Sequence, residues 1–267
     1  ATLRENDEIS IVSYTKSNQV VDIKMPVDPL EAPFWIDNLS DDPNTVTISK
    51  SYWSNAYSVK IEKSANMKRW VYVEYSGLSG GAKITIAPQS RIYLRFSLNG
   101  GKISSLSGYM SEGIDYITSA NNIDASKPYA IGGNILSLLN GPLYVPGERL
   151  FNSQQIDGSI KDGHQIGTFA ELFKDSTTLV DASKLILPNN LTTYNCYYNM
   201  FGGCTSLTSA PVLPATTMTS NAYNRMFNGC SSLETLPEIS GSEISTRMFY
   251  NCIGMSNVTV PSTITTI

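Results

Sequence analysis

The sequence has little of what most enzymes and nucleic-acid-binding proteins need. Its 267 residues include a single histidine, His164, and only four cysteines. Charged residues make up 16% of the chain, and 19 basic residues stand against 23 acidic ones, for a net charge of −4. One histidine leaves few routes to histidine-based catalysis. The charge balance argues against nucleic acid, which is usually bound by a basic stripe. Four cysteines are too few for a scaffold held together by disulfides.

Long apolar runs are missing as well. No run approaches the 18 residues that a membrane-spanning helix requires, so we expect a chain that does not span a membrane. The first ten residues, ATLRENDEIS, have neither the charged start nor the apolar stretch of a signal peptide. A signal removed ahead of residue 1 would leave the same sequence, so the location stays open.

The second half of the sequence is repetitive. A phenylalanine preceded by leucine or methionine recurs at positions 151, 173, 201, 227 and 249, with spacings of 22, 28, 26 and 22 residues. The copy at 151 is degenerate, because little around it matches the others. Each unit is too short to bury its own apolar residues, so equivalent side chains are expected to stack in ladders along a solenoid. The expected repeat core is Phe173, Leu179, Phe201, Cys204, Leu207, Phe227, Cys230, Leu233, Phe249 and Cys252.

Local sequence predicts the shape of one repeat. The M-F-x-G-C pieces predict a short helix followed by a turn, and the residues after them predict a short strand. Stacked copies of that strand would form a narrow parallel sheet. Pro211, Pro214 and Pro237 are expected at the corners, because proline cannot serve inside a central strand.

These repeats resemble a known family. The stretches NMFGGCTSLTSAPVLPATT (199–217), RMFNGCSSLETLP (225–237) and SNVTVPSTITTI (256–267) resemble BspA-type leucine-rich repeats. GGNILSLLNG (132–141) resembles the segment that precedes them and is expected to act as an N-terminal cap. The sequence departs from the family at Ser176, where cysteine is expected, and at Ile253-Gly254-Met255, which replaces S-S-L.

The resemblance implies a function as well as a fold. Proteins with such repeats occur on the surfaces of gut and oral Bacteroidetes and in phages that infect them. They are associated with adhesion and recognition, without enzymatic activity of their own.

The first half of the chain shows period-two alternation instead of the long repeat. The expected strands lie near 9–11, 20–23, 46–48, 57–61, 70–75, 82–86 and 91–96. Such short strands favour a small β-sandwich or barrel, and APFWIDNLSDDPNTVTISK resembles the β modules that often precede BspA-type repeats.

Together these patterns predict a mainly β chain with short helices. The expected divisions are a strand-rich arm (1–30), a β-sandwich-like domain (31–117), a linker (118–131) and a solenoid (132–267). The solenoid would contain the cap and about four to five coils, with an incomplete C-terminal end.

Catalytic and metal sites have weak support. His164 lies in a polar loop, KDGHQIG, typical of a surface residue. The cysteines could suggest zinc, but three of them follow the repeat period and none forms a C-x₂-C pair, so stacking explains them. A Cys196–Cys204 disulfide stays open. The pair Asp41-Asp42 is typical of a solvated turn, because the residues around it lack the pattern of a calcium-binding loop. We therefore expect no catalytic, cofactor-binding or metal-binding residues.

A binding face is the remaining candidate site. Tyrosine offers rigid amphipathic area that suits recognition, and the residues expected to be exposed are Tyr194, Tyr198, Asn199 and Arg225. The sequence therefore predicts a non-enzymatic protein displayed on a phage virion, as a fibre or receptor-binding protein, or on a bacterial envelope. Its partner would be a host-surface protein or glycan, or another virion or envelope subunit, and a homo-oligomer stays open. The alternatives are a purely structural virion or envelope component and an accessory domain of a larger protein.

Overall fold

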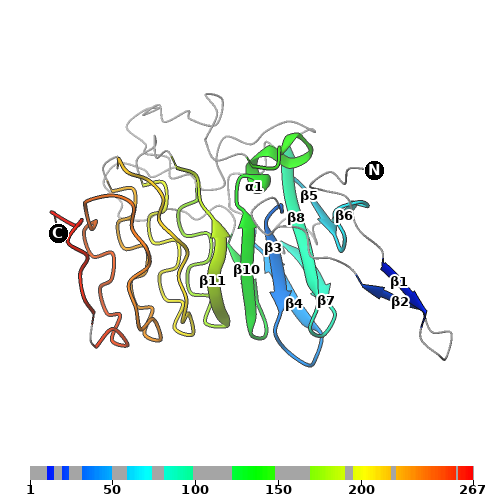
Figure 1. Ribbon diagram of the computed structural model, residues 1–267, viewed down its shortest axis with the longest axis horizontal. Coiled ribbons are helices and arrows are strands. Elements are labelled where there is room, and N and C mark those ends of the chain that lie inside the picture. Colours follow the sequence, from blue (N-terminus) through cyan, green and yellow to red (C-terminus); the bar gives the residue numbers. More distant parts are fainter. Residues whose placement is uncertain are drawn as a thin grey trace.

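The computed structural model describes residues 11–14, 20–23, 32–49, 59–73, 81–98, 122–147, 169–189, 195–217, 221–256 and 258–266. Within these residues the chain is mainly β (Figure 1), as predicted, with one short α-helix, α1 (Ser137–Asn140), followed by a 3-10 turn, η2 (Gly141–Leu143). Strands β1 (Ile11–Tyr14) and β2 (Val20–Ile23) pair as an antiparallel hairpin inside the expected arm.

Two further sheets are built mainly from strands of the N-terminal half. The larger has the strand order β11-β10-β3-β8-β5-β6, and the smaller has the order β7-β4-β9. The bounds of these strands are β3 (Trp35–Asn38), β4 (Asn44–Ile48), β5 (Val59–Ser64), β6 (Val71–Val73), β7 (Ala82–Ile86), β8 (Arg91–Leu98), β9 (Ile123–Ala125), β10 (Tyr129–Asn134) and β11 (Leu179–Ile186).

Strand β8 shows why the two sheets pack together. Ile92, Leu94 and Phe96 alternate along it and are buried in the core that both sheets share. The intervening side chains lie on the opposite face of the sheet, where Arg91 pairs with Asp37 and Arg95 pairs with Glu62. The predicted alternation therefore separates an apolar inner face from a charged outer face.

The predicted linker is wrong over much of its length. Residues 123–125 form β9, which pairs with β4, and β10 begins at Tyr129 and pairs with β3. Ile123 and Tyr129 are fully buried. The many polar residues of this segment suggested a linker. Its few apolar side chains are buried in the core, and the free energy of that burial holds the segment in place as strands.

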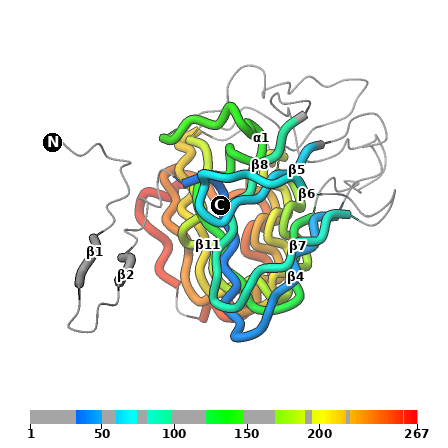
Figure 2. Tube along the Cα trace, turned by 90° about the vertical axis from the view of Figure 1, so that its right-hand side faces the viewer, coloured from blue at the N-terminus to red at the C-terminus, as the bar shows by residue number. Residues whose placement is uncertain are grey.

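Strand β10 joins the N-terminal sheets to the repeats. It pairs in parallel with β11, the strand of the first described repeat. In the described residues of the later repeats, the parallel arrangement continues through isolated bridges, such as Asp181 with Ser209 and Leu213 with Ile239. The sheet is thus narrower than expected. Pro211 and Pro214 flank the bridged positions and lack the N–H that a longer ladder would need. Successive repeats stand side by side from β11 to the C-terminal end, and Figure 2 looks along this row.

The short helix predicted in each repeat is replaced by consecutive turns. In one repeat the N–H of Met200 donates to the carbonyl of Tyr197, and that of Cys204 donates to Phe201. Asn195, Asn199 and Gly203 have positive φ, four residues apart. A helix needs right-handed backbone at every residue, so a left-handed residue in each turn excludes it. Asparagine and glycine adopt the left-handed conformation at the lowest cost in free energy.

Aromatic rings form the centre of the repeat row. Phe173, Phe201, Phe227 and Phe249 stack in order, with centroids 5.4, 5.4 and 5.5 Å apart. The stack continues into the N-terminal half, because Phe34 lies 6.0 Å from Phe173. A second stack joins Phe169, Tyr197 and Tyr223, at 5.8 and 5.5 Å. Of the ten predicted core residues, nine are buried and Phe249, in the last described coil, is partly buried.

Candidate functional site

The turns of neighbouring repeats are held together by a regular backbone pattern. Alternate N–H groups bond within their own turn, and the others donate to the next repeat. Asn199 donates to Asn224 (3.0 Å), Phe201 to Met226 (2.9 Å) and Gly203 to Asn228 (2.8 Å). The backbones of adjacent repeats are thereby held about 4.8 Å apart, the spacing of strands in a sheet. This side of the row, which we call the turn face, is a rigid surface.

The cysteines line the interior beneath the turn face. Three of the four thiols donate to a phenylalanine carbonyl in the preceding repeat: Cys204 to Phe173 (3.0 Å), Cys230 to Phe201 (3.1 Å) and Cys252 to Phe227 (3.0 Å). All four cysteines are free and buried, so the Cys196–Cys204 disulfide is absent. No group of three potential metal ligands occurs among the described residues.

Ser176 replaces cysteine for a reason that the structure makes plain. It belongs to the first described repeat, whose neighbour is the N-terminal half. Its hydroxyl donates to Asp124 (2.5 Å) and lies 2.8 Å from the hydroxyl of Tyr129. A thiol is a much weaker hydrogen-bonding group and would leave these buried polar atoms poorly satisfied. The departure from the family pattern marks the joint between the two halves.

Burial also changes how the thiols ionise. Desolvation raises the pKa of the Cys252 thiol from an ordinary 9.0 to about 11, and it raises the pKa of Cys204 and of Cys230 as well. Between pH 9 and 11 the unfolded chain has released a proton from Cys252 that the folded chain still holds. The contribution of the Cys252 thiol to the stability of the folded chain is therefore fully present below pH 9 and is lost as the pH rises through about 11.

We predict that the urea-unfolding midpoint falls as the pH is raised from about 8 to about 11. The buried hydroxyls of Tyr197 and Tyr223, whose pKa values are also raised by desolvation, act in the same direction. In Cys252→Ser the fall should be shallower, because a serine hydroxyl does not titrate in this range. A midpoint that stays constant or rises over the range would contradict the assignment.

Two of the predicted binding residues come together on the turn face. Nη1 of Arg225 donates to the hydroxyl of Tyr198 in the neighbouring repeat, at 3.2 Å, and both side chains are partly exposed. Asn199 was expected to be exposed, but it is only 8% exposed and its Nδ2 lies 3.4 Å from Glu171. Its left-handed backbone turns the side chain against the neighbouring repeat. Tyr194 lies outside the described residues.

Two further exposed residues of the turn face were not predicted from the sequence. Arg247 is exposed and Tyr250 is 58% exposed. They occupy the same two repeat positions as Glu171 and Lys174, which form an ion pair at 2.9 Å, so Arg247 and Tyr250 lie within reach of each other. Aligning the repeats by their stacked phenylalanine could have identified Arg247, because Arg225 and Arg247 both stand two residues before that phenylalanine.

The arginines of this face hold an unfavourable backbone conformation. The φ angles of Arg225 and Arg247 are 55° and 53°, a region that costs a side-chain-bearing residue about 1–2 kcal/mol. Asparagine or glycine fits better, and Asn199 stands at the same repeat position. The two arginines also lie on adjacent repeats, where like charges repel. Neither forms an ion pair among the described residues.

His164 lies outside the described residues. In the described part of the chain, no helix is long and apolar enough to cross a membrane.

Comparison with known proteins identifies the repeats. The family described as BspA type leucine rich repeat region matches residues 161–267 in 6 copies. No curated protein and no solved structure matches the chain. The matched residues include the phenylalanine stack, the cysteine ladder and the turn face. Residues 161–267 are therefore a BspA-type leucine-rich repeat region, and this chain is a protein with BspA-like leucine-rich repeats.

Proposed function

We propose that this chain is a non-enzymatic recognition protein displayed at a surface, either a bacterial envelope or a phage virion. In this proposal the two sheets of the N-terminal half make a sandwich-like module and the repeats make a solenoid. The solenoid binds a protein or glycan partner. The family supports the proposal, since BspA-type repeat proteins are often associated with surfaces and adhesion.

The observation that carries the proposal is the group of Tyr198, Arg225, Arg247 and Tyr250, which we call the recognition face. Its arginines lie at strained backbone positions where an asparagine would fit with less strain. Strain of this kind is concentrated at functional sites, and tyrosine and arginine dominate the energetics of many interfaces. Because the arginines lack carboxylate partners among the described residues, the partner should present acceptor or anionic groups.

Arg247 offers a direct test of the strain. Arg247→Asn is expected to raise the free energy of unfolding by about 0.5–1 kcal/mol, because asparagine tolerates the left-handed conformation. Urea unfolding measures the change. Lys184→Asn removes one positive charge from an exposed position of β11, without a left-handed backbone, and should give no gain. A loss of stability in Arg247→Asn would contradict the proposed strain.

Display at a surface is tested by immunogold electron microscopy with an antibody against residues 161–267. The antibody is applied to intact source cells and to phage grown on them. Label on the cell exterior or on virions is expected. Label confined to the cytoplasm of sectioned cells would contradict display. If virions are labelled but the recognition face binds no partner, the result would favour a purely structural component of the virion.

A further inference from the structure

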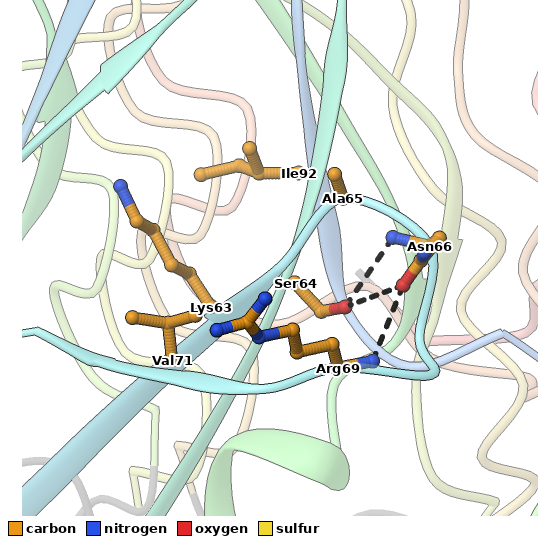
Figure 3. Close-up of a pocket in the computed structure, with 7 residues that line it drawn as sticks. All are labelled: Lys63, Ser64, Ala65, Asn66, Arg69, Val71 and Ile92. Carbon is orange, nitrogen blue, oxygen red and sulfur yellow. Dashed lines mark hydrogen bonds between the residues drawn. The ribbon is translucent and has the colours of Figure 1, made fainter.

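The N-terminal half contains a hollow that the repeats do not share. It has a volume of about 360 Å³ and lies at the end of β5, in the turn that joins β5 to β6 (Figure 3). Strand β6 is the edge of the six-stranded sheet opposite β11, so the hollow is at the far side of that sheet from the repeats. Its lining residues are Lys63, Ser64, Ala65, Asn66, Arg69, Val71 and Ile92.

Asn66 organises the turn beside the hollow. Its Oδ1 accepts from the backbone N–H of Lys68 (3.0 Å) and of Arg69 (3.2 Å), and lies 3.3 Å from the hydroxyl of Ser64. These contacts use the acceptor end of the amide, while its NH₂ end has no hydrogen-bond partner among the described residues. The Asn66 side chain therefore fixes the turn, while its NH₂ group has no partner in the part of the chain that the structure describes.

The two cations of the hollow likewise have no acidic partner among the described residues. Lys63 and Arg69 form no ion pair with any described carboxylate, and Figure 3 shows their side chains extending to the same side of the turn. Elsewhere on the same sheet, Arg91 and Arg95 are each paired with an acidic residue. The polar ends of Lys63, Arg69 and Asn66 are all hydrogen-bond donors, and none of the described lining residues is a carboxylate.

Apolar surface completes the lining. Val71 is 47% exposed, and Ile92 lies on the core side of β8. A ligand here would meet donors at one side and C–H groups at the other. This arrangement suits a small ligand that carries an oxyanion on an amphipathic body.

We propose that this hollow is a second binding site, which takes an acidic sugar residue, with its carboxylate held by Lys63 and Arg69. The sugar hydroxyls accept from Asn66, and the C–H face of the ring packs on Val71 and Ile92. The volume of about 360 Å³ is near the lower end for ligand pockets, as expected for a single sugar residue. The site is independent of the recognition face.

The test is calorimetric titration of the intact chain with N-acetylneuraminate and glucuronate, in parallel with N-acetylglucosamine, N-acetylglutamate and inorganic sulfate. At least one acidic sugar should bind, more tightly than the other three probes. Binding should weaken as salt is added. Lys63→Gln and Arg69→Gln should each lower the affinity about tenfold, the effect of losing one charge-assisted hydrogen bond.

The controls separate this site from a general effect of charge and from the repeats. Lys83→Gln removes a positive charge from an exposed position of β7 that does not line the hollow, and should leave the affinity unchanged. Arg225→Asn, on the recognition face, should also leave it unchanged. Circular dichroism verifies that each variant is folded. Equal binding of the neutral sugar, of N-acetylglutamate or of sulfate would overturn the assignment, as would absence of binding by both acidic sugars.

Discussion

Replacing Phe201 with alanine should lower the free energy of unfolding by about 3–5 kcal/mol. The ring is fully buried and stacks on Phe173 on one side and on Phe227 on the other, at 5.4 Å in each case. Alanine leaves a cavity in the middle of the stack, and the hydrogen bonds between neighbouring repeats prevent its collapse. Because each repeat is stabilised by its neighbours, unfolding should also become less cooperative. Urea unfolding followed by circular dichroism measures both effects.

Phe249 provides the matched control. It stands at the same repeat position in the last described coil, is partly buried, and stacks on Phe227 alone among the described rings. Phe249→Ala should therefore cost clearly less than Phe201→Ala, about 1–2 kcal/mol. Equal losses for the two variants would mean that the stack does not stabilise the repeats as described.

Substitution of Gly133 should have a comparable effect at the joint between the two halves. This residue lies in β10, has a φ of 71°, and an added Cβ would collide with the carbonyl oxygen of Pro33. The left-handed conformation costs alanine about 1–2 kcal/mol, and overpacking adds about 1–3 kcal/mol. Gly133→Ala is thus expected to lose about 2–5 kcal/mol, measured by urea unfolding.

Gly229 separates the two contributions. Its φ is 77°, but an added Cβ would lie 3.7 Å from its nearest neighbour, the backbone nitrogen of Gly203. Gly229→Ala should therefore show the conformational cost alone, about 1–2 kcal/mol. If Gly133→Ala costs no more than Gly229→Ala, the close approach of β10 to Pro33 is not a constraint on the fold.

The joint makes the two halves one body. Phe34 extends the phenylalanine stack, β10 pairs with β11, and the hydroxyl of Tyr129 meets Ser176. The segment GGNILSLLNG, which was predicted to be a cap, lies beside this joint: Ser137 of α1 donates to the carbonyl of Leu94 and accepts from the N–H of Phe34, whose ring stacks on Phe173. The N-terminal half thus covers the first described repeat, which would otherwise expose its apolar ladder.

How far the sequence could predict this structure depends on the range of the interactions. The periodic Phe, Cys and Leu positions predicted the buried ladder, because stacked equivalents must share an environment. The alternation of Ile92, Leu94 and Phe96 predicted the inner face of β8 for a similar reason. The helix prediction failed because it weighed local apolar residues and neglected the asparagines and glycines that recur four residues apart.

Contacts distant in sequence were beyond prediction. Ile123 and Tyr129 look like residues of a polar linker until their partners in β4, β3 and the first repeat are known. The recognition face likewise depends on which side chains the turns bring together. Tyr198 and Arg225 were predicted from the sequence to be exposed, while the burial of Asn199 follows from its left-handed backbone.

The most direct test of the account is binding by a variant of the recognition face that remains fully folded. The intact chain is applied to an array of glycans and surface proteins, together with Arg225→Asn/Arg247→Asn and the charge-matched control Lys83→Asn/Lys184→Asn. We predict that the intact chain and the control bind the same ligand, and that the face variant binds it at least about tenfold more weakly. Its unfolding midpoint should be unchanged or higher. Equal binding by all three proteins, or no ligand for the intact chain, would contradict recognition through the repeats.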